Sequence, residues 1–82
     1  MKVIYDEISV KWEYCGKNIQ VTLDKILHAS FRKSKNTIVI ETGEGFIEEC
    51  LYYYSLDGEF LLKNNLETGE VTWYHNGEHQ LA

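Results

Sequence analysis

Apolar and polar residues alternate along the first part of the chain with a period of two. From Glu7 to Tyr14 every second side chain is Ile, Val, Trp or Tyr, and the positions between them are Glu, Ser, Lys and Glu. Residues 19–23 repeat this pattern after the turn residues Gly16-Lys17-Asn18. Because successive side chains of a strand point to opposite faces, the pattern predicts two half-buried strands joined as a hairpin.

The rest of the chain reads as further strands between turns. The stretch TIVIET at 37–42 is rich in β-branched residues, and residues 46–55, 60–64, 71–75 and 79–81 follow as strands. Asp57-Gly58 and Asn76-Gly77 predict two-residue hairpin turns, and Gly69 predicts a left-handed position in a three-residue loop. We therefore predict an all-β fold, an antiparallel meander of about seven short strands that forms a small barrel or a dimerising sheet.

One segment fits two structures. In residues 22–33, TLDKILHASFRK, the apolar side chains fit one face of a strand and also one face of a helix that Thr22 would cap. We favour a strand because both neighbouring segments read as strands. The alternative is an α+β fold with one helix near 22–33.

Length and charge narrow the class of protein. The 82 residues suffice for a single small β domain over 1–82. The formal charge of −5 argues against nucleic acid as a partner, because such binding depends on neutralising phosphates. No stretch has the roughly 20 apolar residues that cross a membrane, and the first residues do not resemble a signal peptide. We expect a cytoplasmic protein with no membrane partner.

The stretch ECLYYYSLDGEF at 49–60 raises the question of which sheet face is the core. A two-residue turn at Asp57-Gly58 would place Tyr52 opposite Lys63, and a loop closing on Leu66 and Glu70 would place Lys63 opposite Trp73. One face then reads as core and carries Leu51, Tyr53, Phe60, Leu62 and Tyr74. The other face carries Tyr52, Tyr54, Leu61, Lys63, Trp73 and His75.

Two interpretations of the second face stay open. In one, the chain's own N-terminal strands cover it and the Lys63 ammonium group reaches out to water. In the other, it contacts another molecule, because aromatic and partly wet surfaces are typical of protein interfaces. Lys63 would also be placed for a cation–π contact with an aromatic ring.

The residues that could support catalysis or metal binding are few. His75 and His79 flank a turn but pair with Glu78 and Tyr74, which places them on opposite faces, so we expect no metal site. Cys50 lies among apolar residues, where a thiolate is disfavoured. Cys15 and Cys50 are too few for a disulfide framework. We expect no cofactor and no enzymatic activity.

The sequence thus favours a small, non-catalytic protein-binding module or small subunit that acts through an aromatic sheet face. Its partner is another protein or a second copy of the chain. The predicted binding residues are Tyr52, Tyr54, Lys63, Trp73 and His75. The alternative is a small-ligand binder that uses a barrel interior or an aromatic cage.

Overall fold

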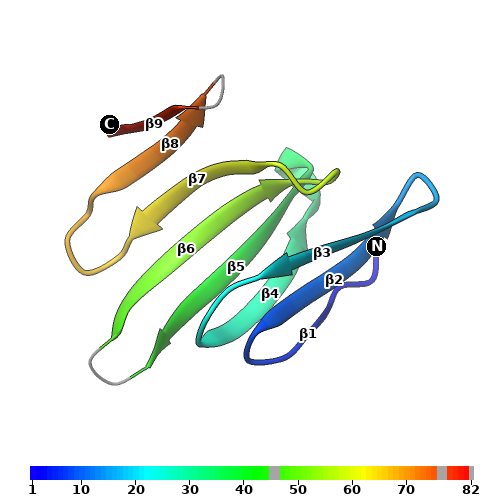
Figure 1. Cartoon of the computed structure of the whole chain (residues 1–82), viewed down its shortest axis with the longest axis horizontal. Coiled ribbons are helices and arrows are strands. Elements are labelled where there is room, and N and C mark those ends of the chain that lie inside the picture. Colours follow the sequence, from blue (N-terminus) through cyan, green and yellow to red (C-terminus); the bar gives the residue numbers. More distant parts are fainter. Residues whose placement is uncertain (45–46, 76–77, 82) are drawn as a thin grey trace.

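The chain folds into two antiparallel β-sheets (Figure 1). The structure is a computed structural model that describes residues 1–44, 47–75 and 78–81; for residues 47, 74, 75 and 78–81 it describes the backbone alone. The smaller sheet has the order β1-β2-β3 and the larger sheet the order β4-β5-β6-β7-β8-β9. The strands are β1 (Ile4–Tyr5), β2 (Ser9–Tyr14), β3 (Lys17–Thr22), β4 (Ile26–Arg32), β5 (Thr37–Glu44), β6 (Ile47–Ser55), β7 (Phe60–Asn65), β8 (Val71–His75) and β9 (Glu78–Leu81), with one 3₁₀ turn, η1 (Lys33–Lys35).

The predicted all-β meander is confirmed. Within each sheet, consecutive strands pair antiparallel, and the described residues form two open sheets rather than a closed barrel. The helix considered near 22–33 is wrong, because Ile26–Arg32 is strand β4. In β4 the inward residue Ala29 is 5% exposed, while its neighbours His28 and Ser30 are exposed, as a period of two requires.

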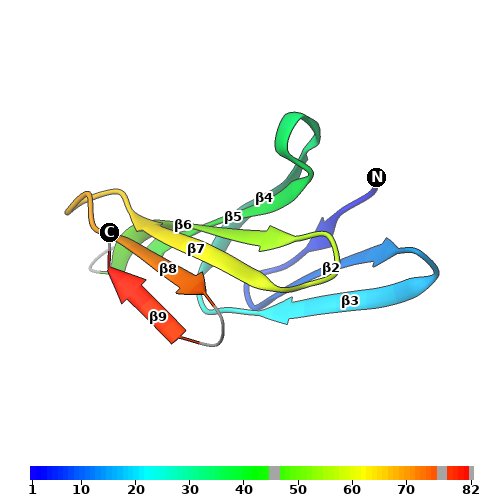
Figure 2. The same cartoon turned by 90° about the horizontal axis from the view of Figure 1, so that it is seen from above.

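The smaller sheet packs on one face of the larger sheet at the β4 end, and we call this face the inner face (Figure 2). The core between the sheets is made of buried residues from β2, β3, β4 and β5: Val10, Trp12, Val21, Ile26, Ala29, Ile38 and Ile40. The Trp12 indole N–H donates a hydrogen bond of 2.7 Å to the carbonyl oxygen of Leu56, in the loop between β6 and β7. The same loop approaches β3, since a Cβ atom on Gly58 would lie 2.7 Å from Ile19 Cγ2.

The first strand is shorter than its pattern predicts. Ile8 is 58% exposed and precedes β2 instead of belonging to it. The cause is Asp6, whose carboxylate accepts hydrogen bonds from the backbone N–H groups of Ile8 and Ser9, each at 2.9 Å. These bonds hold the pKa of Asp6 below its usual 3.8 and form a turn that competes with the strand.

The cross-strand register decides which tyrosines face the core. Ile40 pairs with Tyr52 and Ile38 pairs with Tyr54, so both tyrosines lie on the inner face beside buried isoleucines. Tyr53 pairs with Val39 and lies on the opposite side, which we call the outer face. The predicted assignment of the two faces is therefore reversed along β6. Coverage of Tyr52 and Tyr54 by the N-terminal strands, which was one of the two open interpretations, is confirmed.

Two one-residue differences in register account for the remaining departures. Between β6 and β7 the predicted pair Tyr52–Lys63 is confirmed and Tyr53 pairs with Leu62, but Tyr54 pairs with Phe60, which leaves Leu61 as a bulge. Phe60 consequently faces inward, with ring centroids 5.6 Å from Tyr54 and 6.4 Å from Tyr52.

The loop between β7 and β8 also closes one residue earlier than predicted. The Asn65 side chain accepts hydrogen bonds from the backbone N–H groups of Glu67 and Thr68, and the Asn65 backbone N–H donates to Glu70. Gly69 has the predicted left-handed conformation, with φ of +78°. Because the loop closes at Asn65, Trp73 pairs with Leu62 and not with Lys63. A slip of one residue places Trp73 on the outer face.

The core between the sheets predicts a large effect of truncating Ile40, which is fully buried on β5. We expect Ile40→Ala to lower the free energy of unfolding by about 2–5 kcal/mol, measured by urea denaturation followed by circular dichroism. The matched control is Ile8→Ala, which removes the same atoms from a side chain that is 58% exposed. Equal losses in the two variants would contradict the assignment of Ile40 to the core.

Candidate binding surfaces

The structure separates the five predicted binding residues. Tyr52, Tyr54 and Lys63 lie on the inner face, and Trp73 lies on the outer face. His75 belongs to β8 and pairs with Glu78 as predicted, but its side chain is outside the described part of the chain. An aromatic cage built from Tyr52, Tyr54 and Trp73 is therefore wrong, because Trp73 is on the other side of the sheet.

The predicted cation–π contact is present on the inner face. Lys63 Nζ lies 5.4 Å from the centroid of the Tyr52 ring. Burial acts to lower the pKa of Lys63, but Tyr52 and nearby acidic groups outweigh it and raise that pKa above the usual 10.5. Lys63 is thus a cation at neutral pH, and it occupies a position over the Tyr52 ring that a cationic ligand would need.

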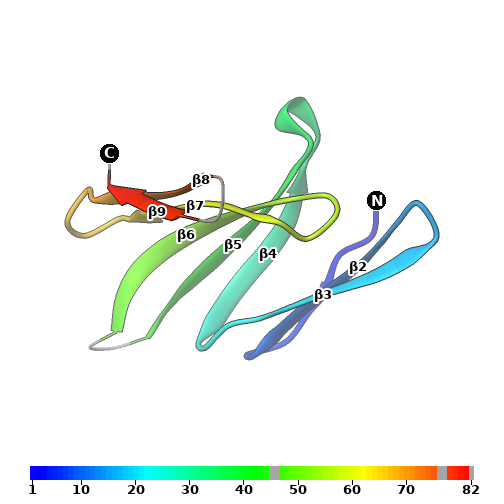
Figure 3. The same cartoon turned by 45° about the horizontal axis from the view of Figure 1, so that its top comes forward.

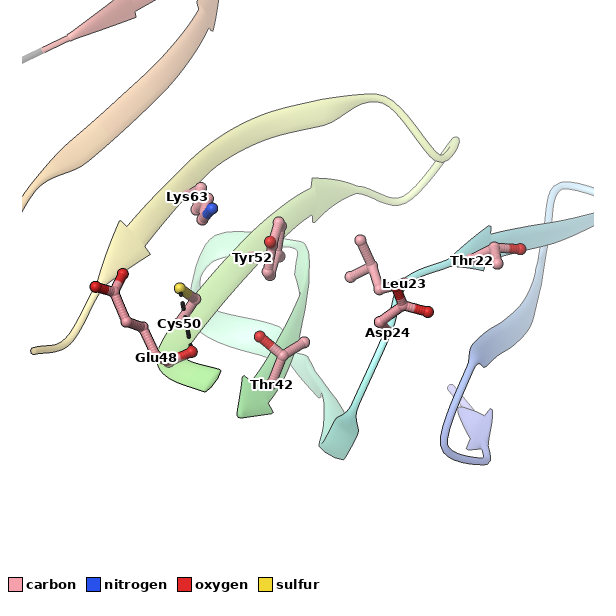
Figure 4. A pocket seen from close by; sticks show the side chains of 8 residues that line it. All are labelled: Thr22, Leu23, Asp24, Thr42, Glu48, Cys50, Tyr52 and Lys63. Carbon is pink, nitrogen blue, oxygen red and sulfur yellow. Dashed lines mark hydrogen bonds between the residues drawn. The ribbon is translucent and has the colours of Figure 1, made fainter. Parts of the chain in front are cut away.

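A pocket of about 550 Å³ opens beside this pair, at the border of the smaller sheet (Figure 4). We call it the inner pocket. It lies between the connection from β3 to β4 and the strands β5, β6 and β7, and it carries carboxylates as well as the Lys63 cation. Its lining residues are Thr22, Leu23, Asp24, Thr42, Glu48, Cys50, Tyr52 and Lys63.

The acidic and thiol groups of the inner pocket are partly engaged. The Asn65 side-chain amide donates a hydrogen bond to the Glu48 carboxylate, and the Cys50 thiol donates to the Glu48 carbonyl oxygen at 3.7 Å. Burial raises the pKa of the Cys50 thiol above its usual 9.0. The protonated form of the thiol is therefore favoured, which makes it a poor nucleophile.

The outer face carries a continuous row of mostly apolar side chains. Backbone pairing aligns the row across five strands, from β4 to β8, and we call it the outer row: Ser30, Val39, Tyr53, Leu62 and Trp73. Val39 is 7% exposed, Tyr53 and Leu62 are half-buried, and Trp73 is 43% exposed. Ser30, at the β4 end, is exposed as well, so the exposed fraction is lowest at Val39 on β5 and rises from there toward β8.

A second hollow, of about 340 Å³, lies on this face. Within the described part of the chain, only the larger sheet and η1 line it: Arg32, Lys35, Thr37, Tyr53, Leu61, Leu62, Asn64, Val71 and Trp73. The Arg32 guanidinium carbon lies 5.7 Å from the Tyr53 ring centroid, so the cation covers one end of the aromatic surface. Figure 3 shows the smaller sheet beside β4, at the opposite end of the larger sheet from β8.

Most of this surface was not predicted from the sequence. Val39, Tyr53 and Leu62 lie in predicted strands, but the predicted register placed Tyr53 and Leu62 in the core, and no role was predicted for Arg32. The Asn65-Leu66-Glu67-Thr68 stretch was the available signal, because an asparagine that bonds two backbone N–H groups ahead of it is typical of a loop start.

Neither a metal centre nor a membrane-spanning helix is found in the described part of the chain. Among these residues, no group of three or more His, Cys, Asp or Glu side chains is arranged to hold a metal ion. No helix there has the length and apolar character needed to cross a membrane. Comparisons with protein-family models, with curated proteins and with solved structures gave no match.

The environments of the two cysteines predict a difference in thiol reactivity. Cys15 is exposed at the β2–β3 turn, and Cys50 is 5% exposed with a raised pKa. We expect a disulfide reagent such as 5,5′-dithiobis-(2-nitrobenzoate) at neutral pH to modify Cys15 at least about tenfold faster than Cys50, because Cys15 is accessible whereas Cys50 is buried and its thiol has a raised pKa. The Cys15→Ser and Cys50→Ser variants assign each rate. Equal rates in the native protein would contradict the burial of Cys50.

Proposed function

We propose that this chain is a small, non-catalytic protein-binding module that acts through the outer face of its larger sheet. The observation that carries the proposal is the outer row, which ends in a tryptophan that is 43% exposed and sits in a hollow lined by apolar and cationic side chains. Tryptophan, tyrosine and arginine are the residues that most often dominate the energy of protein interfaces.

The arrangement of the two sheets supports the same proposal. The smaller sheet packs on the inner face at β4, β5 and β6, so the buried core of the domain lies on that side. The outer face keeps half-buried Leu51, Tyr53, Leu62 and Val71 next to Trp73. Contiguous apolar surface of this kind typically marks an interaction site on a small domain.

The proposal places the protein in the cytoplasm. Both cysteines are free, and Cys15 is exposed at a turn. Unpaired and exposed thiols are typical of a reducing compartment.

The proposal predicts that Trp73 contacts another polypeptide. A photo-crosslinking amino acid in place of Trp73, in cells that express the chain, should give a discrete protein adduct after irradiation. The same amino acid in place of Ile8, which is exposed in the turn before β2, serves as the matched control. In addition, Trp73→Ala should change the free energy of unfolding by no more than about 1 kcal/mol. Adducts at position 73 no stronger than those at position 8 would contradict the proposal.

A second candidate function is the binding of a small zwitterion in the inner pocket. The observation that favours it is the presence of the Lys63 cation and of two carboxylates, Asp24 and Glu48, around one hollow of about 550 Å³. An amino acid would place its carboxylate at Lys63 and its ammonium group at a carboxylate, since opposite charges attract most strongly where water is partly excluded.

The inner pocket therefore predicts selectivity for molecules that carry both charges. In ¹H–¹⁵N spectra, glycine should shift the backbone signals of Thr42, Cys50 and Tyr52 at lower concentration than acetate or methylammonium does. Lys63→Gln should abolish the shifts, and Lys11→Gln, exposed on the smaller sheet, should not. Identical titrations of the native protein and the Lys63 variant would exclude this site.

A further inference from the structure

The outer face has opposite charges on the two sides of its apolar row. On one side, backbone pairing aligns Arg32, Thr37 and Ser55. On the other side, it aligns His28, Glu41, Leu51, Asn64 and Val71. The outer row lies between these two flanking rows, which we call the cationic flank and the anionic flank.

The charges of each flank are reinforced by a second residue. Lys35 belongs to η1, which directly follows Arg32 at the end of β4. Both residues line the hollow of about 340 Å³ on the outer face, and both side chains are exposed. Beyond Glu41, the Glu49 side chain lies over Gly43, where a Cβ atom would come within 2.9 Å of Glu49 Cγ. His28 on the anionic flank is hydrogen-bonded through Nδ1 to the Tyr5 hydroxyl at 3.1 Å.

We propose that the molecule bound by the outer face is a second copy of this chain, related by a twofold axis that lies along the outer row. The inference rests on the proposed function, since it assigns the partner of the same face. A rotation about this axis reverses the strand direction and keeps the order of the strands. It therefore lays the cationic flank of each copy on the anionic flank of the other.

The spacing of the rows allows the opposite charges to meet. Neighbouring rows on one face are about 7 Å apart along the strand, and neighbouring strands are about 4.8 Å apart. Arg32 of one copy then lies across from His28 of the second copy, whose Nδ1 is bonded to the Tyr5 hydroxyl, and about one strand away from Glu41 of that copy, within reach of two long side chains. Because the operation is twofold, the same pair forms twice.

The apolar residues match in the same arrangement. Residues on the axis face their own counterparts, so Tyr53, Leu62 and Trp73 of one copy meet the same residues of the other. The backbone N–H of Ser55 donates to the Glu59 carbonyl oxygen, so an acidic residue, Glu59, ends the row of the cationic flank just before β7. Across from it the second copy presents Asn64 instead of another acid.

Charge also distinguishes a second copy from other partners. A strongly basic protein would meet repulsion at Arg32 and Lys35, and a strongly acidic one would meet repulsion at Glu41 and Glu49. A copy of the same face presents the opposite charge to each flank. Each copy carries a formal charge of −5, so association depends on this local pairing to offset the overall repulsion.

The size of the face indicates a weak, reversible dimer. Five strands and about seven residues of each give a patch of about 24 Å by 23 Å, or about 1,100 Å² for the two copies together. This is at the low end of specific interfaces, so we expect dissociation constants in the micromolar range.

Charge exchange at positions 32 and 41 tests the twofold arrangement. In sedimentation equilibrium, Arg32→Glu and Glu41→Arg should each raise the dissociation constant of the homodimer at least about tenfold, because like charges would meet twice. The double variant should return to within about threefold of the native value. Lys2→Glu, which makes the same charge change at an exposed residue before β1, should have no effect.

A mixture of the Arg32→Glu and Glu41→Arg variants is the more demanding test. In the mixed dimer, the carboxylate introduced at position 32 of one copy meets the guanidinium introduced at position 41 of the other. The native pair of Arg32 and Glu41 forms at the second, symmetry-related position. An equimolar mixture should therefore dimerise at a concentration at least about tenfold lower than either variant alone requires. Circular dichroism of each variant confirms that it is folded.

Two outcomes would overturn the inference. One is a native protein that stays monomeric up to about 0.5 mM, well above a micromolar dissociation constant. The other is a native dimer that the single variants leave unchanged, which would place the contact elsewhere. If the crosslinker at position 73 captures a different protein while the native chain stays monomeric, the second copy is excluded and the proposed binding face stands.

Discussion

The core of the domain lies on one face of the larger sheet, and a hydrogen bond of Trp12 fixes the smaller sheet against that face. The Trp12 side chain is 4% exposed between the sheets, and its indole N–H bonds to the Leu56 carbonyl oxygen at 2.7 Å. This bond joins β2 to the loop that follows β6, and Ile19 packs on Gly58 in the same loop. Tyr52 and Tyr54 therefore pack against the core, and Tyr53, between them, lies on the other side of the sheet.

The positions of both candidate surfaces follow from the face on which the smaller sheet packs. The inner pocket lies at the border of the smaller sheet, and the outer row lies where that sheet does not reach.

The fold class could be predicted from the sequence because strands and turns are encoded locally. Alternation marks β2 and β3, β-branched residues mark β5, and the left-handed Gly69 was recognised in advance. The faces could not be assigned in the same way, since they depend on single-residue shifts that reverse every side chain beyond them. The shift at Asn65 has a local cause in the hydrogen bonds of its side chain, and a closer interpretation of the loop would have found it. The bulge at Leu61 has no such signal, because two consecutive leucines fit either face.

Each candidate site combines contacts between residues that are close in sequence with contacts between residues that are distant in sequence. Only the contacts within one hairpin could be predicted from the sequence. The contact between Tyr52 and Lys63 follows from one hairpin and was expected from its register. The inner pocket also needs Leu23 and Asp24, which the connection between the two sheets brings to β6 and β7 (Figure 4). The charged flanks need β4 beside β5 in the observed register, with Arg32 opposite Thr37 and His28 opposite Glu41. Because the pattern of residues 22–33 fits both a strand and a helix, the pairing of β4 with β5 could not be predicted from the sequence.

The two tryptophans of the chain report on the two sides of the larger sheet. Trp12 is dry and hydrogen-bonded between the sheets, and Trp73 is 43% exposed on the outer face. The emission of an indole moves to longer wavelength as its surroundings become more polar. The intrinsic fluorescence of the native protein is therefore the sum of a short-wavelength band from Trp12, buried between the two sheets, and a long-wavelength band from Trp73 on the outer face. A spectroscopist can follow the integrity of the domain and the occupancy of its surface in one sample, as separate optical signals and without any attached dye.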